Sequence, residues 1–296
     1  MELRIRNLSK TYANGVVALD KVTLTIPSGM FGLLGPNGAG KSTLMRTLAT
    51  LQECDAGSVF FGDLDVLDDK DDIRRLLGYL PQDFGLYPKV TAYELLDHFA
   101  VLKGLSQRTR RREVVDGLLQ QTNLFEVRNQ RLGTFSGGMR QRFGIAQALL
   151  GDPQLIIVDE PTAGLDPQER VRFHNLLSDI GDDKTVLLST HIVSDVSDLC
   201  ANMAIINKGH VLLCGEPQKL IDDIDGKIWA RFVAKHELAH FQQEHAVIST
   251  RLLTGRTLIH VYAERDPGDG FAPAAGDLED VYFATIAGRH VAASNC

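Results

Sequence analysis

Apolar and polar residues alternate near the start of the chain. Leu3 and Ile5 follow this period of two, and so does the segment 22–26, which comes after an Asn14-Gly15 turn signal. Such alternation predicts two half-buried strands joined through a hairpin-type turn. We therefore expect an antiparallel β edge at the beginning of the fold.

Three later segments are almost continuously apolar, namely 30–34, 155–158 and 185–189. Runs of this kind are typical of strands that are buried on both faces of a parallel sheet. Helical spacing follows the first two of them, over 41–51 and 167–180, the second with a proline in its first turn. Strands that alternate with helices in this way predict an α/β core with a mostly parallel sheet.

The spacing changes over residues 88–150, where apolar side chains recur every three or four positions and predict an inserted helical region. After about residue 216 the pattern restarts. Segments 227–233 and 256–263 have strand character, and 235–244 has helical character. This predicts a small C-terminal α/β or α+β domain.

A length of 296 residues suggests about two domains, which we place at 1–215 and 216–296. The formal net charge is −7, so charge gives no reason to expect nucleic acid as a partner. No apolar run approaches the roughly 18 residues that a membrane span needs, so we expect no direct membrane span.

The segment from Gly35 to Ser42 fits the pattern G-x-x-x-x-G-K-[ST] between a predicted strand and a predicted helix. In such loops the backbone N–H groups point at phosphate oxygens, and the helix start adds its positive dipole end. Lys41 can neutralise the β- and γ-phosphates, and the Ser42 hydroxyl can ligate Mg²⁺. The alternative is a purely structural role, in which the glycine turn binds no ligand. The expected phosphate contacts are Gly35, Pro36, Asn37, Gly38, Ala39, Gly40, Lys41, Ser42 and Thr43.

Two carboxylates follow the apolar run 155–158. Ligands in open α/β sheets bind at the carboxyl ends of the strands, where Asp159 is expected to lie. We assign Asp159 as the Mg²⁺ anchor, directly or through water, and Glu160 as the residue that polarises the attacking water. The alternative for Glu160 is a solvated surface carboxylate.

The segment Phe135-Ser136-Gly137-Gly138 resembles the signature of ABC-type ATPases, which is usually Leu-Ser-Gly-Gly-Gln; here Met139 replaces the glutamine. Other motifs of that family follow in the expected order over roughly residues 1–215. They are an adenine-stacking aromatic at Tyr12, a Q-loop glutamine at Gln82, a D-loop aspartate at Asp166 and a switch histidine at His191. A hydrogen-bonded loop histidine and a packed surface aromatic remain the alternatives for His191 and Tyr12.

The resemblance implies a P-loop NTPase (RecA-like) core with an inserted helical subdomain, and an ATPase that binds ATP and Mg²⁺. Ser42, Gln82 and Asp159 would hold the metal, and His191 would contact the γ-phosphate. Ser136, Gly137 and Gly138 would face the ATP of another copy in a head-to-tail homodimer, with Asp166 coupling the two sites.

The resemblance also implies a transporter motor whose membrane spans lie on a separate permease subunit. The chain would then be cytoplasmic and peripheral on the inner face of the cell membrane. The string 164–167 and the segment 278–283 resemble ATPases of ABC-2 exporters for drugs, antibiotics or sodium, so we favour export. In that family a groove beside residues 82–88 receives a helix of the permease, and Phe84, Leu86 and Tyr87 would suit it unless they pack within this chain.

Three alternatives remain open from the sequence. A soluble ABC ATPase acting on ribosomes or DNA is the main rival, and an unrelated P-loop kinase is the second. The third comes from His236-Glu237-Leu238-Ala239-His240, which matches H-E-x-x-H. On a helix these two histidines could share a face and hold Zn²⁺, with Glu244 or His245 as a third ligand. A solvated helix face is the favoured interpretation of this segment.

Overall fold

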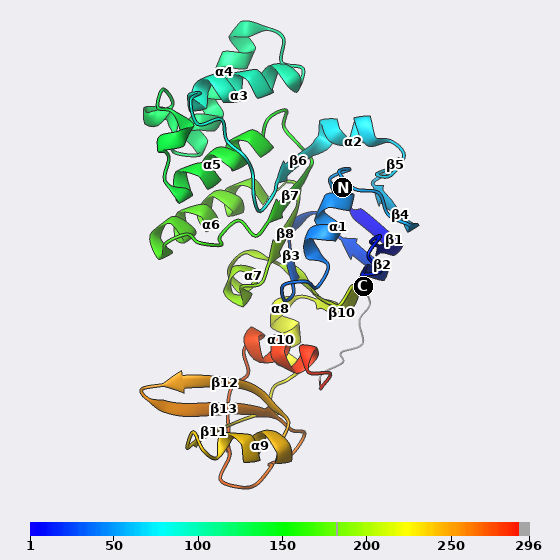
Figure 1. The fold of residues 1–296 in the computed structure, drawn as a ribbon, viewed down its shortest axis with the longest axis vertical. Coiled ribbons are helices and arrows are strands. Elements are labelled where there is room, and N and C mark those ends of the chain that lie inside the picture. Colours follow the sequence, from blue (N-terminus) through cyan, green and yellow to red (C-terminus); the bar gives the residue numbers. More distant parts are fainter. Residues whose placement is uncertain (182, 290–296) are drawn as a thin grey trace.

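The computed structural model describes residues 1–181 and 183–289, and three β-sheets organise it (Figure 1). The first sheet has the order β2-β1-β4-β5, with β1 Leu3–Thr11, β2 Val17–Ile26, β4 Ala56–Phe61 and β5 Leu64–Asp65. All of its pairs are antiparallel, and β1 and β2 form the hairpin predicted at Asn14-Gly15. The expected antiparallel edge is therefore confirmed.

The second sheet has six strands in the order β10-β9-β3-β8-β7-β6. Their bounds are β3 Gly29–Leu34, β6 Leu77–Leu80, β7 Leu155–Asp159, β8 Thr185–Thr190, β9 Asn202–Asn207 and β10 His210–Gly215. All neighbouring pairs are parallel except β9 with β10. The three continuous apolar runs became β3, β7 and β8, so the predicted α/β core with a mostly parallel sheet is confirmed.

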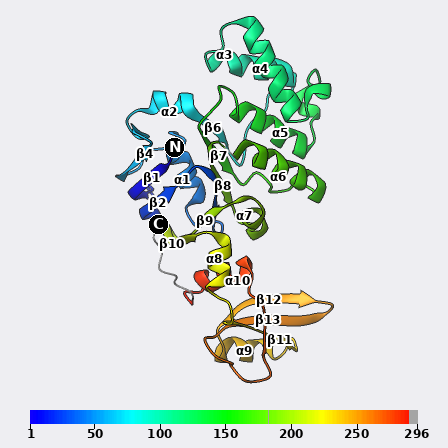
Figure 2. The same cartoon turned by 180° about the vertical axis from the view of Figure 1, so that it is seen from behind.

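Both faces of the second sheet are buried, which explains its uninterrupted apolar strands. Leu155 and Ile157 of β7 join a core shared with the first sheet and with helix α1, which spans Lys41–Leu48. Ile156 and Val158 join the opposite core, beneath the helices α5 Gly137–Ala148, α6 Pro167–Gly181 and α7 Val193–Leu199. The sheet thus lies between an antiparallel layer and a helical layer, as Figures 1 and 2 show from two sides.

The helices divide into groups by the core that they cover. Their bounds are α1 Lys41–Leu48, α2 Lys70–Leu76, α3 Ala92–Leu102, α4 Arg108–Gln121, α5 Gly137–Ala148, α6 Pro167–Gly181, α7 Val193–Leu199, α8 Pro217–Asp222, α9 Leu238–Glu244 and α10 Leu278–Ile286. Two short 3₁₀ turns lie at Phe125–Val127 and Leu132–Thr134. Helices α3, α4 and α5 share a core of their own, so the helical region predicted over 88–150 is present.

A seam joins the helical region to the second sheet at Gly78 of β6. A methyl group on this residue would lie 2.2 Å from the carbonyl oxygen of Ala148, the last residue of α5. We expect Gly78→Ala to lower the free energy of unfolding by about 1–3 kcal/mol, because the backbone must move apart. Urea unfolding measures this. The control is Gly117→Ala in α4, whose added methyl group meets nothing within 4 Å and should not destabilise the protein. Equal stability of the two variants would contradict the close packing of β6 against α5 at Gly78.

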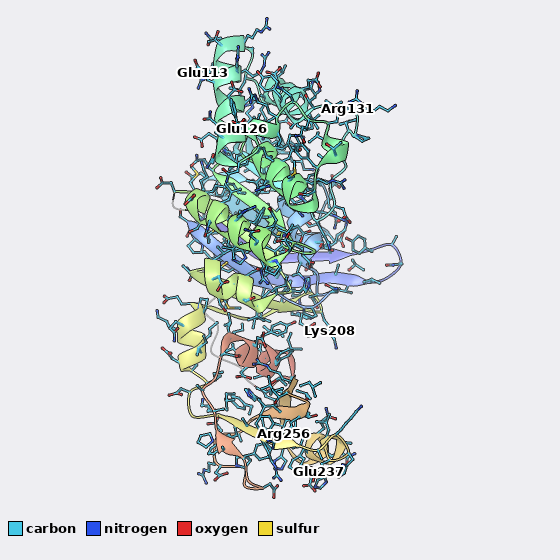
Figure 3. The ribbon with its side chains drawn as sticks, turned by 90° about the vertical axis from the view of Figure 1, so that its left-hand side faces the viewer. Glu113, Glu126, Arg131, Lys208, Glu237 and Arg256 are labelled. Atoms are coloured by element: carbon cyan, nitrogen blue, oxygen red, sulfur yellow. The ribbon has the colours of Figure 1, made fainter. Side chains whose placement is uncertain are left out.

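The third sheet, of order β12-β13-β11-β14, lies at the far end of the molecule from the helical region (Figure 1). Its strands are β11 Ile228–Val233, β12 Val247–Leu253, β13 Arg256–Tyr262 and β14 Ala272–Pro273. Figure 3 shows the elongation, with Glu113 near one end and Glu237 near the other. Residues 290–296 of the predicted C-terminal domain lie outside the described part of the chain.

Helix α10 connects the third sheet to the rest of the molecule. Val281 and Ala284 are buried in the same core as Val196 of α7 and Met203 of β9. On the other side, the Nδ1 atom of His260 in β13 lies 2.8 Å from Oδ1 of Asp280 in α10. The helix begins with a capping box between Asp277 and Asp280, a strong start signal.

Candidate functional site

The predicted phosphate loop connects β3 to α1, as the strand–loop–helix pattern requires. Gly38 and Gly40 have φ angles of +79° and +108°, a region that favours glycine. A methyl group on Gly40 would lie 2.4 Å from the carbonyl oxygen of Ala18, and one on Gly35 would lie 2.3 Å from that of Ile206. Loop shape and packing therefore both demand these glycines.

Lys41 begins α1, and its side chain is only 4% exposed. Its Nζ atom donates to the carbonyl oxygens of Gly35 at 2.7 Å and Pro36 at 3.2 Å. The same nitrogen lies 3.2 Å from Oε1 of Glu160. The lysine is thus held at the mouth of its own loop, against the residue that follows β7.

Three segments that are far apart in the sequence meet at the Glu160 carboxylate. Lys41 approaches Oε1 of Glu160. The other oxygen, Oε2, lies 3.1 Å from Nδ1 of His191 and 3.5 Å from Nε2 of Gln82. Glu160 is buried and has a φ of +48°, which is strained for a non-glycine residue. Its backbone N–H donates to the Ser189 carbonyl. The alternative of a solvated surface carboxylate is therefore wrong for Glu160.

Asp159 ends β7 with its side chain buried. Its Oδ1 atom accepts a hydrogen bond from the Ser189 hydroxyl, a partner that the sequence did not indicate. With Ser42 at the start of α1 and Gln82 after β6, it offers hydroxyl, amide and carboxylate oxygens at one edge of the sheet. Hard oxygen ligands of this kind suit Mg²⁺, so the donor set fits the predicted metal.

Tyr12 follows β1, and the residue is 37% exposed. Its hydroxyl lies 3.1 Å from Oγ1 of Thr43 and donates to Oε1 of Gln52 at 3.1 Å. These contacts bring the ring beside the first turn of α1. The Thr43 hydroxyl lies against Tyr12, although the sequence suggested a phosphate contact for it.

The signature segment begins α5. The Ser136 hydroxyl caps this helix by accepting from the Met139 N–H at 3.2 Å. A methyl group on Gly138 would lie 2.4 Å from Oε2 of Glu169 in α6, so this glycine permits close helix packing. Within residues 1–181 and 183–289, no hydrogen bond or ion pair joins 136–138 to the phosphate loop.

Asp166 precedes α6, and its Oδ1 atom accepts from the N–H of Glu169 at 2.9 Å. The D-loop aspartate thus also acts as a cap for the following helix. Its side chain is exposed, as is Ser136. Both residues therefore lie on the surface of this chain and away from the contacts of Lys41.

The structure contradicts the helical H-E-x-x-H interpretation. Helix α9 begins at Leu238 rather than at 235, because Glu237 forms a turn in which its Oε2 atom accepts from the N–H of Ala234 at 2.8 Å. His236 therefore precedes the helix and does not share a helical face with His240.

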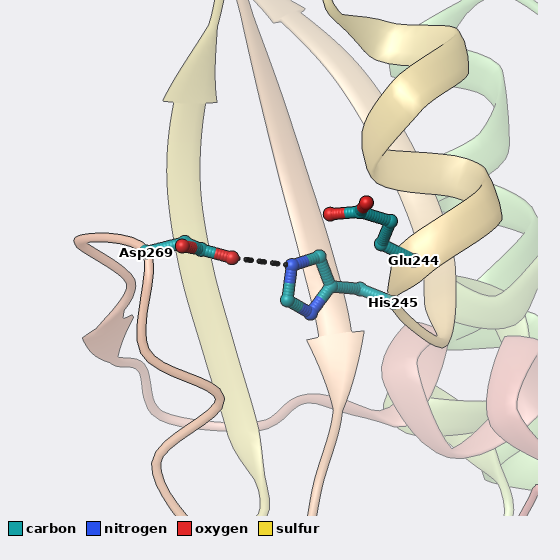
Figure 4. Close-up of side chains that lie close together, drawn as sticks. All are labelled: Glu244, His245 and Asp269. Carbon is teal, nitrogen blue, oxygen red and sulfur yellow. Dashed lines mark hydrogen bonds and ion pairs between the residues drawn. The ribbon is translucent and has the colours of Figure 1, made fainter.

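A different group of possible ligands lies nearby. Glu244, His245 and Asp269 are the one such cluster in the described part of the chain, and Figure 4 shows their approach. The Nε2 atom of His245 lies 3.0 Å from Oδ2 of Asp269, and its ring packs on Phe241 and Phe271. Both carboxylates are exposed, so an ordinary surface ion pair accounts for the cluster.

None of the helices in residues 1–181 and 183–289 has the length and apolar composition that a bilayer span needs.

Comparison with known proteins identifies the family. A family model described as "ABC transporter" matches residues 19–163. ABC transporter A family member 8 of Dictyostelium discoideum is 37% identical over 217 residues; the match covers 71% of this chain but only 26% of that longer protein. Nod factor export ATP-binding protein I of Mesorhizobium japonicum is 37% identical over 299 residues, and the match covers 96% of this chain and 86% of that protein.

Among solved structures, a dimeric post-hydrolysis state of an ATP-binding cassette, bound to ADP and Pi, is 29% identical with a TM-score of 0.66. The match covers 72% of this chain and 98% of that one. Sequence and fold therefore agree over the region that carries the phosphate loop. The chain belongs to the family of ABC transporter ATP-binding proteins and is an ATPase.

Proposed function

We propose that this chain is the ATP-hydrolysing subunit of an ABC exporter and that two copies close head to tail around two ATP molecules. The observation that carries the proposal is the convergence of Lys41, Gln82 and His191 on the carboxylate of Glu160. Each residue comes from a different motif, and together they suit the transfer of a phosphoryl group to water.

The proposed hydrolysis begins with a change of partner at Lys41. Phosphate oxygens compete with Glu160 and with the loop carbonyls for the lysine ammonium, since they carry more charge. Glu160 is then released to accept a proton from the attacking water. Because Nδ1 of His191 is already engaged by Glu160, its Nε2 is the ring nitrogen available for the γ-phosphate.

Ser42, Gln82 and Asp159 would hold Mg²⁺ in this scheme. Bound Mg²⁺ would neutralise charge on the β- and γ-phosphates. Within the chain, the Ser189 hydroxyl fixes the orientation of Asp159, as partners of metal ligands commonly do. The buried position of Asp159 at the end of β7 supports its role as an anchor.

The head-to-tail arrangement is supported by the exposure of Ser136 and Asp166. The start of α5 offers the N–H groups of a helix end, which favours an anion. In the part of the chain that the structure describes, no hydrogen bond or ion pair joins it to the phosphate loop of its own chain. A second copy can complete the site by supplying this helix end to the γ-phosphate. The dimeric state of the similar cassette supports the pairing of two copies.

A surface groove supports docking of a separate membrane subunit. It has a volume of about 710 Å³ and lies between β6, α3 and α5, with Leu51 and Leu102 exposed along it by 65% and 69%. An amphipathic helix can bury such leucines. Phe84 and Leu86 pack partly against cores of this chain, which is the alternative that the sequence left open, and Tyr87 is 63% exposed. None of these three residues lines this groove.

Export is supported by the name of the Mesorhizobium relative, an export ATP-binding protein. The chain would then be cytoplasmic and peripheral on the membrane. A soluble ATPase acting on ribosomes or DNA is the rival. We expect a tagged chain, purified in mild detergent, to recover a multi-span membrane protein, and we expect Leu51→Asp with Leu102→Asp to lose it. Recovery of ribosomes or DNA in its place contradicts the transport proposal.

A further inference from the structure

Asp195 lies in the first turn of α7, four residues after His191, and its side chain has no exposed surface. A carboxylate at such a position loses its hydration and is stable as an ion only when it is paired and hydrogen-bonded. None of the roles assigned to the site uses this residue. Its partners therefore indicate what the burial achieves.

Both oxygens of the Asp195 carboxylate are fully engaged. Oδ2 accepts from the hydroxyls of Thr162 at 2.6 Å and Thr190 at 2.9 Å. Oδ1 accepts from Nε of Arg170 at 2.9 Å and lies 2.8 Å from Nε2 of His174. The partners come from three segments: the loop after β7, the end of β8, and helix α6.

Thr190 ties this network to the switch histidine. Its hydroxyl accepts from the N–H of Ile192 at 2.9 Å, so the hydroxyl proton is directed to Asp195. These two hydrogen bonds hold the chain on both sides of His191. A loss of the acceptor at Asp195 would free the turn that aims the imidazole at Glu160.

Thr162 ties the same carboxylate to the other half of the site. It follows Glu160 by two residues, in a loop closed by hydrogen bonds from Ala163 N–H to the Glu160 carbonyl and from Leu165 N–H to the Thr162 carbonyl. The strained backbone of Glu160 depends on this loop, because such φ angles persist only when the surroundings fix them.

We propose that Asp195 is a positioning residue that holds the Glu160 loop and the His191 loop in register for hydrolysis. It touches neither the phosphate loop nor Lys41, and it acts through Thr162 and Thr190. The proposal rests on the proposed roles of Glu160 and His191 in ATP hydrolysis. According to this proposal, Asp195 contributes to the turnover of ATP but not to the binding of ATP.

Asp195→Asn keeps the shape of the side chain but replaces one acceptor oxygen with a donor amide that meets other donors. We expect kcat to fall about tenfold or more, since small displacements of catalytic groups carry costs of this size. The KM for ATP should stay within about twofold, because the nucleotide-gripping contacts lie outside the network.

Two substitutions at Thr162 test the same proposal if the Asp195→Asn variant does not fold. Thr162→Ser keeps the hydroxyl, and Thr162→Val keeps the shape without it. The valine variant should share the loss of kcat, and the serine variant should retain the wild-type rate. Asp198→Asn is the control on the same helix as Asp195. Asp198 is 60% exposed, and its contact with this network is a long one, 3.6 Å from its Oδ2 atom to Nδ1 of His174.

The measurement is steady-state ATP hydrolysis by the full chain with its co-purified membrane subunit, below the thermal midpoint of every variant. A fall in kcat at constant KM for Thr162→Val, with Thr162→Ser and Asp198→Asn unchanged, supports the proposal. Wild-type kcat in Thr162→Val, or a KM that rises with the loss of rate, overturns it. A wild-type chain that does not hydrolyse ATP overturns the proposed function instead.

Discussion

Glu160→Gln should lower the rate of ATP hydrolysis by about 10² to 10⁴-fold, the usual contribution of a general base. The amide has the same shape as the carboxylate and keeps one acceptor oxygen, which can face Lys41, but it takes no proton from water. ATP binding should persist because the loop glycines, Lys41 and Ser42 are unchanged. Single-turnover hydrolysis, measured beside nucleotide affinity, separates these two effects.

Glu113→Gln is the matched control for this experiment. Glu113 lies in α4, is exposed, and is near one end of the elongated molecule (Figure 3). It should hydrolyse ATP at the wild-type rate. Wild-type turnover in Glu160→Gln would mean that another group activates the water, and the convergence on Glu160 would then be structural only.

Lys41→Ala should reduce turnover by about 10² to 10³-fold or more, because the preorganised charge on the transferring phosphoryl is lost. The substitution also removes the buried ammonium that neutralises Glu160 at 3.2 Å, so nucleotide affinity should fall as well. Hydrolysis and nucleotide titration measure both changes. Lys235→Ala, an exposed site, is the control and should change neither.

The same variant tests whether two chains share each site. Ser136→Ala alone should also lose turnover, because its hydroxyl and helix end belong to the partner's ATP in the proposed dimer. When it is mixed with Lys41→Ala, one of the two composite sites in a mixed dimer regains both groups. Partial recovery of hydrolysis is therefore expected, and no recovery would count against cross-subunit sharing.

Much of the core was predictable because its burial leaves a local trace in the sequence. β3, β7 and β8 are apolar on both faces, so their residues form unbroken runs. The phosphate loop was predictable because a left-handed glycine and a helix start must follow one another in a fixed order. The helix start at Gly137 is likewise marked by the Ser136 cap.

Other elements left weaker traces. Helix α2 is made mostly of charged residues and buries only Ile73, so its apolar spacing is too sparse to detect. The helix predicted from 235 begins only at Leu238, because the side-chain turn at Glu237 competes locally with helix formation. Strand β12 was missed because only two of its residues are buried.

The polar network around the site was also beyond the sequence. The Thr162 and Asp195 side chains meet across 33 residues, and neither lies in the motifs that the sequence indicated. Ser189 was expected only as a strand residue, yet it orients Asp159. Such pairs depend on the register of neighbouring parallel strands, here Asp159 beside Ser189, which no single segment encodes.

The central claim is that two copies of this chain grip ATP together. Sedimentation velocity of the Glu160→Gln variant, with and without saturating MgATP, tests it most directly, because blocked hydrolysis leaves the closed state in place. The account predicts monomers without nucleotide and dimers of twice the mass with MgATP. Monomers under both conditions, with the membrane subunit also supplied, would contradict it.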